Sequence, residues 1–251
     1  MPAPAASPTA TPAAPPIGDR KAGKKAAVEQ MFDSIAPRYD LINRILSFGI
    51  DRLWRRRAIA WIAAHHPKRL LDVATGTADL ALDALRLAPA HIDGVDLSAE
   101  MLAVGREKVA ARGASGVITL TQGDAEHLPF DDDRFDAALV AFGVRNFEHL
   151  DAGLAEIRRV LAPGAPLVVL EFSQPRNPVV AWVYGLYSRF VLPEVGGRVS
   201  GNKGAYTYLP QSAAVFPDHE RFLAHLRAAG FTAVEQKRLT FGVASLYKGL
   251  A

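Results

Sequence analysis

The 251-residue sequence contains no cysteine. This absence excludes disulfide scaffolds, zinc sites built on thiolates and enzymes with a cysteine nucleophile. Also absent are a secretory signal and an apolar run of the about eighteen residues that a transmembrane helix needs. The longest candidate span, Val179–Pro193, is short and contains Arg189. We therefore expect a soluble protein of the cytoplasm.

The sequence has little net charge. Lys and Arg number 29 and Asp and Glu number 26, which gives a net charge of +3. That excess lies before residue 27, where Asp19 is outnumbered by Arg20, Lys21, Lys24 and Lys25. The isoelectric point of 9.2 therefore reflects one end of the chain and does not indicate a nucleic-acid-binding face. We expect no nucleic-acid partner.

Composition divides the chain into a tail and one domain. Met1–Pro16 consists almost entirely of Pro, Ala, Ser and Thr, and such a stretch buries too little apolar area to offset the entropy of ordering it. We therefore expect residues 1–26 to form a disordered tail with a basic exit. Residues 27–251 have the composition of a single globular domain. Within it, residues 27–66 are helical and amphipathic, and residues 176–212 form an insertion rich in aromatic residues.

From residue 69 onward, short apolar runs alternate with longer segments of helical periodicity. The strand-like runs are Leu70–Ala74, Ile92–Val95, Val117–Thr121, Asp136–Ala141 and Leu167–Phe172. Because each run is almost continuously apolar, the pattern predicts a parallel sheet covered by helices on both faces, which is a doubly wound α/β fold. A helix over Asp218–Ala229 and strands near Val234 and over Gly242–Tyr247 follow the insertion.

Three loops follow the first three predicted strands, and in such a sheet ligands bind beyond these strand ends. The first loop has Gly76, which permits a sharp turn and a close approach of the backbone to a ligand. Asp96 ends the second strand, where a carboxylate accepts hydrogen bonds from ribose hydroxyls. In the third loop, Asp124 and the Ala125 N–H can bind an adenine ring. Together the loops predict a pocket for an adenine nucleoside.

The first loop favours S-adenosylmethionine over a nicotinamide dinucleotide. Dinucleotide enzymes favour G-x-G-x-x-G, whereas here Gly76 is followed by Thr77, Ala78 and Asp79. Asp72 and Asp79 place carboxylates beside the turn, where they repel a pyrophosphate but suit an ammonium and a sulfonium. A nicotinamide-dependent oxidoreductase remains the alternative.

Several longer stretches resemble one family, the ubiquinone/menaquinone biosynthesis C-methyltransferases. The resemblance runs from about Met31 to the C-terminus, and its most specific stretches are Phe142–Asn146 and Ala205–Ser212. The other matching stretches are Phe32–Asn43, Arg52–Arg56, Leu170–Ser173 and Leu239–Ala244. Two positions depart from the family pattern: Ala78 stands where glycine is common, and Ala141 where serine is common.

The resemblance implies a class I S-adenosylmethionine-dependent methyltransferase with a seven-stranded, mostly parallel sheet and an N-terminal helical cover. It implies methylation of a ring carbon of a polyprenylated hydroquinone, which is demethylmenaquinol, 2-methoxy-6-polyprenyl-1,4-benzoquinol or both. It carries the cofactor contacts to Thr77, Asp96, Asp124 and Ala125, to which the loop argument adds Asp72 and Gly76. A non-catalytic quinone-binding subunit of a biosynthetic assembly is the rival of another class.

Carbon methylation of a phenol requires a charge stabiliser for the developing oxyanion and a group that orients the ring. Arg145 stays charged at any working pH, so we assign it oxyanion stabilisation. Asn146 would hold the same oxygen, and Tyr39 could donate a hydrogen bond from the overlying N-terminal helix. The alternative is a structural ion pair between Arg145 and Glu148 or Asp151.

Other side chains offer weaker candidates for chemistry. His149 could act as a base, although a loop histidine entering a helix is the favoured interpretation. The run Asp131–Asp133 is interpreted as a solvated turn, and we expect no metal because methyl transfer needs none.

Two surfaces could contact partners, and each has two interpretations. The aromatic residues of the insertion could line a channel for a prenyl tail or form a dimer interface. Arg52, Arg55, Arg56 and Arg57 could contact anionic lipid head groups at a membrane surface, or simply form a solvated helix face.

Overall fold

A computed structural model describes residues 23–192, 194 and 203–251. The expected tail over Met1–Pro16 lies outside these residues, as does part of the insertion at 176–212. Within the described residues, none of the helices combines the length and the apolar composition that crossing a bilayer requires.

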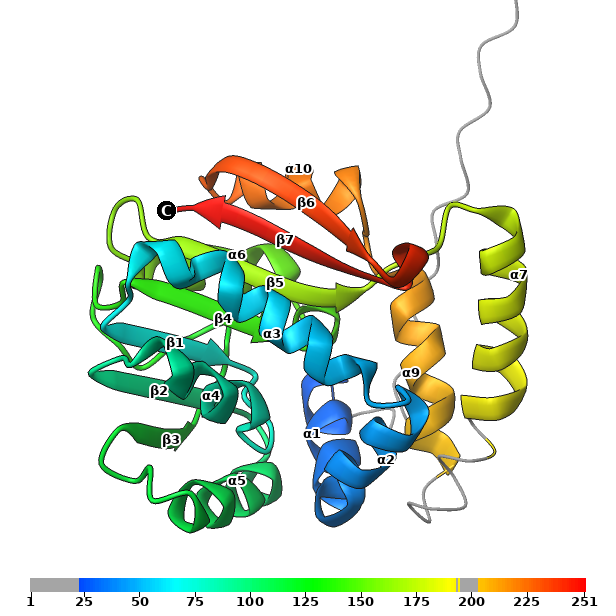
Figure 1. Cartoon of the computed structure of the whole chain (residues 1–251), viewed down its shortest axis with the longest axis horizontal. Coiled ribbons are helices and arrows are strands. Elements are labelled where there is room, and N and C mark those ends of the chain that lie inside the picture. Colours follow the sequence, from blue (N-terminus) through cyan, green and yellow to red (C-terminus); the bar gives the residue numbers. More distant parts are fainter. Residues whose placement is uncertain (1–22, 193, 195–202) are drawn as a thin grey trace, which may run out of the picture.

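The described strands form one seven-stranded sheet in the order β3-β2-β1-β4-β5-β7-β6 (Figure 1). The bounds are β1 Arg69–Val73, β2 His91–Asp96, β3 Ile118–Gln122, β4 Ala137–Ala141, β5 Pro166–Phe172, β6 Thr232–Leu239 and β7 Ala244–Leu250. The first five strands pair in parallel, whereas β7 pairs antiparallel with both β5 and β6. The strand order reverses between β1 and β4, so the loops after these two strands diverge and leave a crevice.

Helices cover both faces of this sheet. On one face, α3 (Ile50–Ile62), α4 (Asp79–Ala84) and α5 (Ala99–Ala111) contribute to one buried apolar cluster. On the other, α6 (Leu150–Val160) and α10 (Glu220–Ala228) contribute to a second cluster. The continuously apolar strands β1, β2, β4 and β5 are thus explained, because each is buried from both sides, whereas the edge strand β3 alternates between buried and exposed residues. The predicted doubly wound fold is confirmed.

A third apolar cluster lies over the carboxyl ends of the strands and contains no strand residue. It joins α1 (Lys24–Ile35), α2 (Tyr39–Leu46) and α9 (Lys203–Val215) through side chains such as Met31, Ile42 and Tyr206. Figure 1 shows these helices, with α7 (Pro178–Leu186) outside them, gathered at the end of the sheet to which the arrow of β5 points. The helical cover and the insertion therefore enclose the same edge of the sheet.

The boundary expected between tail and domain was placed too late. Helix α1 begins at Lys24, and Lys24 and Lys25 contact the sheet loops instead of belonging to a tail. The Lys24 Nζ donates to the carbonyl oxygens of Phe147, at 2.5 Å, and Arg145, at 3.3 Å. Composition could not predict these contacts, because a lysine is expected to be solvent-exposed unless the groups that accept its hydrogen bonds are known.

Candidate functional site

The turn after β1 brings a carboxylate and a glycine together. Gly76 has a φ of +54°, and a Cβ built on it would meet nothing within 4 Å, so the turn leaves open space beside the backbone. The Gly76 N–H donates to an Asp96 carboxylate oxygen at 2.8 Å. The second oxygen of Asp96 accepts from the Ser98 N–H at 2.9 Å. Two of the predicted loops are thereby locked to each other.

Asp72 lies beneath this turn and is almost fully buried. One of its oxygens accepts from the Thr75 hydroxyl at 2.6 Å, whereas Oδ1 is buried and has no hydrogen-bond partner within the described chain. Burial raises the pKa of Asp72 to about 7, and the nearby charge of Asp96 acts in the same direction. A buried carboxylate oxygen left without a donor suits a cationic ligand in the adjoining cavity.

Thr77 and Ala78 end the turn, and neither side chain is free to extend toward a ligand. The Thr77 hydroxyl donates to Asp40 of α2 at 2.5 Å, and Lys108 Nζ lies 3.1 Å from it. Ala78 has a φ of +62°, a conformation easiest for glycine, and its methyl group is fully buried in the core under α4. The departure from the family pattern at Ala78 therefore lies outside the lining of the cavities.

The loop after β3 faces helix α1. Asp124 forms an ion pair with Lys25 at 2.5 Å and accepts from the Glu126 N–H at 3.0 Å. Burial acts to raise the pKa of Asp124, but the hydrogen bonds from Lys25 and the Glu126 N–H, together with the Lys25 charge, hold the pKa below its usual value. Asp124 and Ala125 both line the smaller of the two cavities described below. An adenine amine at Asp124 would share that carboxylate with Lys25.

Arg145 follows β4, in the short helix η4 (Val144–Asn146), and its side chain is buried. It pairs with the fully buried Glu171 at 2.6 Å and donates to the Phe142 carbonyl at 2.6 Å. Its Nε atom is buried without a hydrogen-bond partner within the described chain. The expected structural alternative, a pair with Glu148 or Asp151, is wrong, because the partner lies on the neighbouring strand β5.

Tyr39 and Asn146 lie in the surroundings of Arg145. The Asn146 amide oxygen accepts from the Tyr208 hydroxyl at 3.3 Å, which connects the β4 loop to α9. Burial raises the pKa of Tyr39, although the charge of Arg145 opposes the shift, so Tyr39 stays protonated and can donate a hydrogen bond at neutral pH. The three residues predicted to serve catalysis are therefore brought together, together with Glu171 and Tyr208, which the sequence did not single out as catalytic.

Two cavities meet at this edge of the sheet. The smaller, about 80 Å³, is lined by Asp96, Asp124, Ala125 and Asn146. The larger, about 270 Å³, is lined by Asp72, Thr77 and Arg145 and by tyrosines of the insertion. Gly76, Tyr39, Ala141 and Phe142 line both. A ligand in one cavity therefore meets a ligand in the other beside Gly76 and Tyr39.

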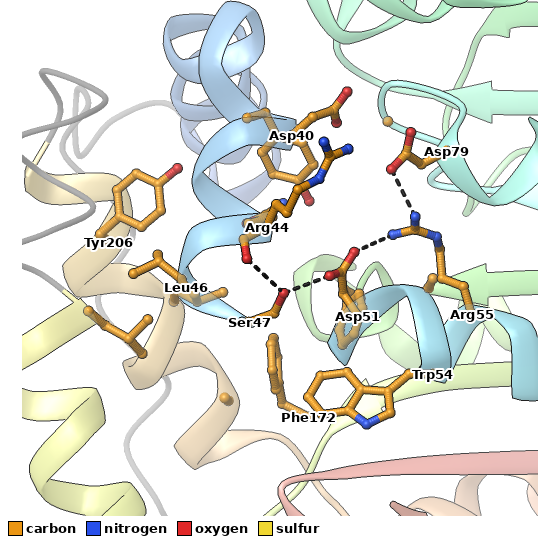
Figure 2. Close-up of a pocket in the computed structure, with 18 of the residues that line it drawn as sticks. Asp40, Arg44, Leu46, Ser47, Asp51, Trp54, Arg55, Asp79, Phe172 and Tyr206 are labelled. Atoms are coloured by element: carbon orange, nitrogen blue, oxygen red, sulfur yellow. Dashed lines mark hydrogen bonds and ion pairs between the residues drawn. The ribbon is translucent and has the colours of Figure 1, made fainter. Parts of the chain in front are cut away.

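The larger cavity contains a charged network that sequence analysis missed. Figure 2 shows Arg55 between Asp51 and Asp79, and the two ion pairs measure 2.7 and 3.0 Å. Lys108 of α5 bonds both Asp79, at 2.5 Å, and Asp40, at 2.6 Å. Arg55 fits neither of the two expected surfaces, lipid-facing or solvated, because it points into the molecule, whereas Arg52, Arg56 and Arg57 are exposed. Only the packing of α2, α3, α4 and α5 against one another brings these charges together.

The weaker candidates separate clearly. His149 is bonded to Glu126 at 2.9 Å, its side chain is 72% exposed, and it lines neither cavity. Asp132 forms a surface ion pair with Arg159 at 2.7 Å, consistent with a turn. Among the described residues, no group of three His, Cys, Asp or Glu side chains is arranged to hold a metal ion. Of the six aromatic residues in the insertion, four line the larger cavity, namely Tyr184, Tyr187, Tyr206 and Tyr208. Trp182 and Phe190 lie outside it.

The sequence and the fold of this chain are both similar to those of known proteins. The profile of the ubiE/COQ5 methyltransferase family matches residues 20–251. The chain belongs to this family. It is similar to a demethylmenaquinone methyltransferase of Deinococcus radiodurans, with 50% identity over 236 residues that cover 94% of this chain and 96% of that protein.

Further similarities agree. A ubiquinone/menaquinone biosynthesis C-methyltransferase UbiE of Geobacter sulfurreducens is 46% identical over 228 residues, 90% of this chain and 89% of that protein. The fold matches that of a SAM-dependent methyltransferase from Thermotoga maritima, with a TM-score of 0.60 and 20% identity over 88% of this chain and 97% of the other.

The expectation of an S-adenosylmethionine-dependent C-methyltransferase in quinone biosynthesis is confirmed by this membership, and the two alternative functions are not favoured. The groups present also suit that cofactor, because the site combines an open glycine turn with two carboxylates, and Oδ1 of Asp72 has no partner within the described chain.

Proposed function

We propose that this methyltransferase methylates a ring carbon of a polyprenylated hydroquinone, with demethylmenaquinol as its first substrate. The meeting of the two cavities carries the proposal. A cofactor over β1, β2 and β3 ends beside Gly76 and Tyr39, and the ring of a quinol in the larger cavity then lies within reach of Arg145. The names of the curated relatives support naphthoquinol over benzoquinol as the ring.

We assign the cofactor to residues of the first three strand loops. Asp96 would hold the ribose, Asp124 and the Ala125 N–H the adenine, and Gly76 with Asp72 the methionine portion. Thr77 would contribute its backbone, because its hydroxyl is bonded to Asp40. Bound there, the cofactor supplies the methyl group.

The chain's own residues would activate the ring. Loss of the proton from a quinol hydroxyl spreads negative charge onto ring carbons, and one of these carbons is the nucleophile. Arg145 stabilises the oxyanion, and its orientation is held by Glu171, whose carboxylate accepts at 2.6 Å. Asn146 and protonated Tyr39 donate to the same oxygen or orient the ring. The buried surroundings strengthen each of these interactions relative to water.

The test is an assay of the purified protein with labelled S-adenosylmethionine and two reduced substrates, demethylmenaquinol and 2-methoxy-6-polyprenyl-1,4-benzoquinol, each with a short tail. We expect methyl transfer to a ring carbon of demethylmenaquinol, with the position read by nuclear magnetic resonance of the product. Faster turnover of the benzoquinol would reverse the order of substrates. Cofactor binding without turnover of either would instead support a non-catalytic quinone-binding subunit.

We further infer that the enzyme works at the inner face of the membrane, as a peripheral protein, because a long prenyl tail resides in the bilayer. A homodimer, or a complex with other quinone-biosynthesis enzymes, is the alternative role of the exposed aromatic residues. Sedimentation of the purified chain would measure its oligomeric state.

A further inference from the structure

Helix α7 has an unusual combination of sequence and burial. Pro178–Leu186 contains no charged residue, yet none of its residues is buried. Trp182 is 67% exposed, and Val183 and Leu186 are also exposed. Figure 1 shows α7 at the outer edge of the molecule, beyond α9. A helix that is apolar all round normally lies inside a protein or a membrane, so the exposed faces of α7 are suited to a further apolar partner.

The turn between α2 and α3 extends the same apolar surface. Phe48 is 80% exposed in this turn, and Ile45 is exposed one turn before it. The Phe48 ring lies 6.3 Å from the ring of Tyr187, which follows α7 and donates its hydroxyl hydrogen to the Leu46 carbonyl at 2.5 Å. The two segments are thus neighbours in space. We call Ile45, Phe48, Trp182, Val183, Leu186 and Phe190 the apolar rim.

The apolar rim adjoins the larger cavity. Phe48 lines this cavity, as do Tyr184 and Tyr187 from α7 and the π-helix that follows it. A long apolar chain bound at the rim therefore has a route past the Tyr184 and Tyr187 side chains toward Arg145. An apolar route of this kind suits a prenyl tail, whose surface gains free energy by staying out of water.

The charged residues of the two segments that form the apolar rim are mostly positive, and the nearest acid after the second segment is Glu194. Residues 176–192 contain no acidic residue, and the two arginines, Arg176 and Arg189, are exposed. On the other side, Arg44 and Arg52 are exposed, and the single acid of residues 41–57, Asp51, is paired with Arg55. A second copy of this chain would bring arginines against arginines, whereas anionic lipid head groups would meet charge of opposite sign.

We propose that the apolar rim is a docking surface for an anionic lipid bilayer. Its side chains enter the boundary between head groups and acyl chains, the flanking arginines contact phosphates, and the mouth of the cavity faces the bilayer. Trp182 suits this depth because an indole has a large apolar body and one polar N–H. Only the role of this docking surface rests on the proposed function. That role is to admit a prenylated quinol without exposing its tail to water.

The experiment measures flotation of the full chain with vesicles that contain no quinol. We expect binding to vesicles of equal phosphatidylcholine and phosphatidylglycerol, and much weaker binding to phosphatidylcholine alone or at high salt. Trp182→Glu and Val183→Glu should each lower the affinity about tenfold, a factor that corresponds to about 1.4 kcal/mol. Circular dichroism verifies that both variants remain folded, as expected for exposed positions.

Matched controls separate the apolar rim from general surface charge. Ala110→Glu adds the same charge on an exposed position of α5, at the far edge of the sheet from α7 (Figure 1), and should bind vesicles as the parent does. Trp182→Phe should retain binding because it keeps an aromatic apolar body. Turnover of a short-tailed quinol in buffer should be unchanged in Trp182→Glu, whereas turnover of a vesicle-embedded quinol should fall with the vesicle affinity.

Three results would overturn the proposal. They are no binding of the parent chain to anionic vesicles, equal binding by Trp182→Glu, and a solution dimer that Trp182→Glu converts to a monomer while vesicles remain unbound. The last result would assign the rim to a second copy of the chain. Because the flotation assay contains no substrate, vesicle binding without turnover of any quinol would retain the docking surface and reject the proposed function.

Discussion

Arg145 is charged and almost completely buried, and the carboxylate of Glu171 compensates this charge. An unpaired guanidinium in this position would be strongly destabilising, because removing one partner of a buried pair typically costs about 3–5 kcal/mol. The pair is close, at 2.6 Å, and burial raises the pKa of Glu171 although Arg145 opposes the shift. Stability and catalysis therefore have to be measured separately at this residue.

Replacement of Arg145 by lysine should lower turnover about 10²–10³-fold at saturating S-adenosylmethionine, the usual loss for one oxyanion donor. A lysine keeps the positive charge near Glu171, but its flexible ammonium cannot reproduce the planar fork of arginine. Because the interaction is strongest in the transition state, the turnover number should fall more than the Michaelis constant for the quinol rises. Cofactor affinity should stay within about twofold, which corresponds to about 0.4 kcal/mol, because the loops assigned to the cofactor follow earlier strands. A folded Arg145→Lys enzyme with full turnover would remove the catalytic assignment.

Asp72 should make cofactor affinity depend on pH. Its pKa of about 7 lies above the ordinary 3.8, so the folded chain keeps a proton that the unfolded chain has released. Over that interval the free energy of unfolding contributed by this group falls as pH rises. A cationic cofactor favours the carboxylate, so affinity for S-adenosylmethionine should rise about tenfold between about pH 6 and about pH 8.

Calorimetric titrations at several pH values measure this slope. Asp72→Asn has nearly the same shape and cannot titrate, so its affinity should be weaker and flatter across the same range. An identical slope in parent and variant would transfer the effect to another group, of which the nearby Asp96 carboxylate is the first candidate.

At the scale of elements, a side-chain hydrogen bond links helix α3 to η6 (Thr240–Gly242), the short helix between β6 and β7, and Trp61 of α3 also contacts Lys237 of β6. The Trp54 indole donates to the Thr240 hydroxyl at 2.8 Å, between residues 186 positions apart. Its ring also packs edge-on against Phe172 of β5. Because Trp54 and Thr240 both line the larger cavity, this contact shapes the site as well as the fold.

Thr240→Val should lower the free energy of unfolding by about 1 kcal/mol, the net contribution of a typical hydrogen bond, because valine keeps the shape of threonine. Trp54→Phe should lower it by more, because it removes the same hydrogen bond and also leaves a cavity where the buried indole was. The double variant should lose less than the sum of the two, since the bond is removed only once. Chemical denaturation of the four proteins forms the cycle. Strict additivity would mean that the bond contributes nothing in solution.

At the scale of the whole molecule, the proposed site joins the loops after β1, β3 and β4 to a cover built from α1, α2 and α9. Lys25 of α1 bonds Asp124, Asp40 of α2 bonds Thr77, and Tyr208 of α9 bonds Asn146. A ligand that fills the space between sheet and cover should therefore stabilise the folded chain as a unit.

S-adenosylhomocysteine at about a hundred times its dissociation constant should add about 2.7 kcal/mol to the free energy of unfolding. For a chain of this size the melting temperature should rise by roughly 5–10 °C. NADH at the same concentration should produce no comparable shift. A larger stabilisation by NADH would contradict the assignment of the pocket to S-adenosylmethionine.

The hydrophobic pattern of the sequence by itself determined the fold class and the position of the loops at one edge of the sheet. Continuously apolar strands alternating with helices specified the doubly wound sheet, since each element must bury its own apolar surface. The loops containing Gly76, Asp96 and Asp124 could be predicted because parallel strands carry their carboxyl ends to one edge. Tertiary structure alone decided which polar groups meet: Glu171 pairs with Arg145, Lys25 pairs with Asp124, and Asp40 accepts a hydrogen bond from Thr77. These partners are 26, 99 and 37 residues apart. Hydrophobic periodicity states only which face of an element is buried, whereas ion pairing depends on how those faces cross once packed.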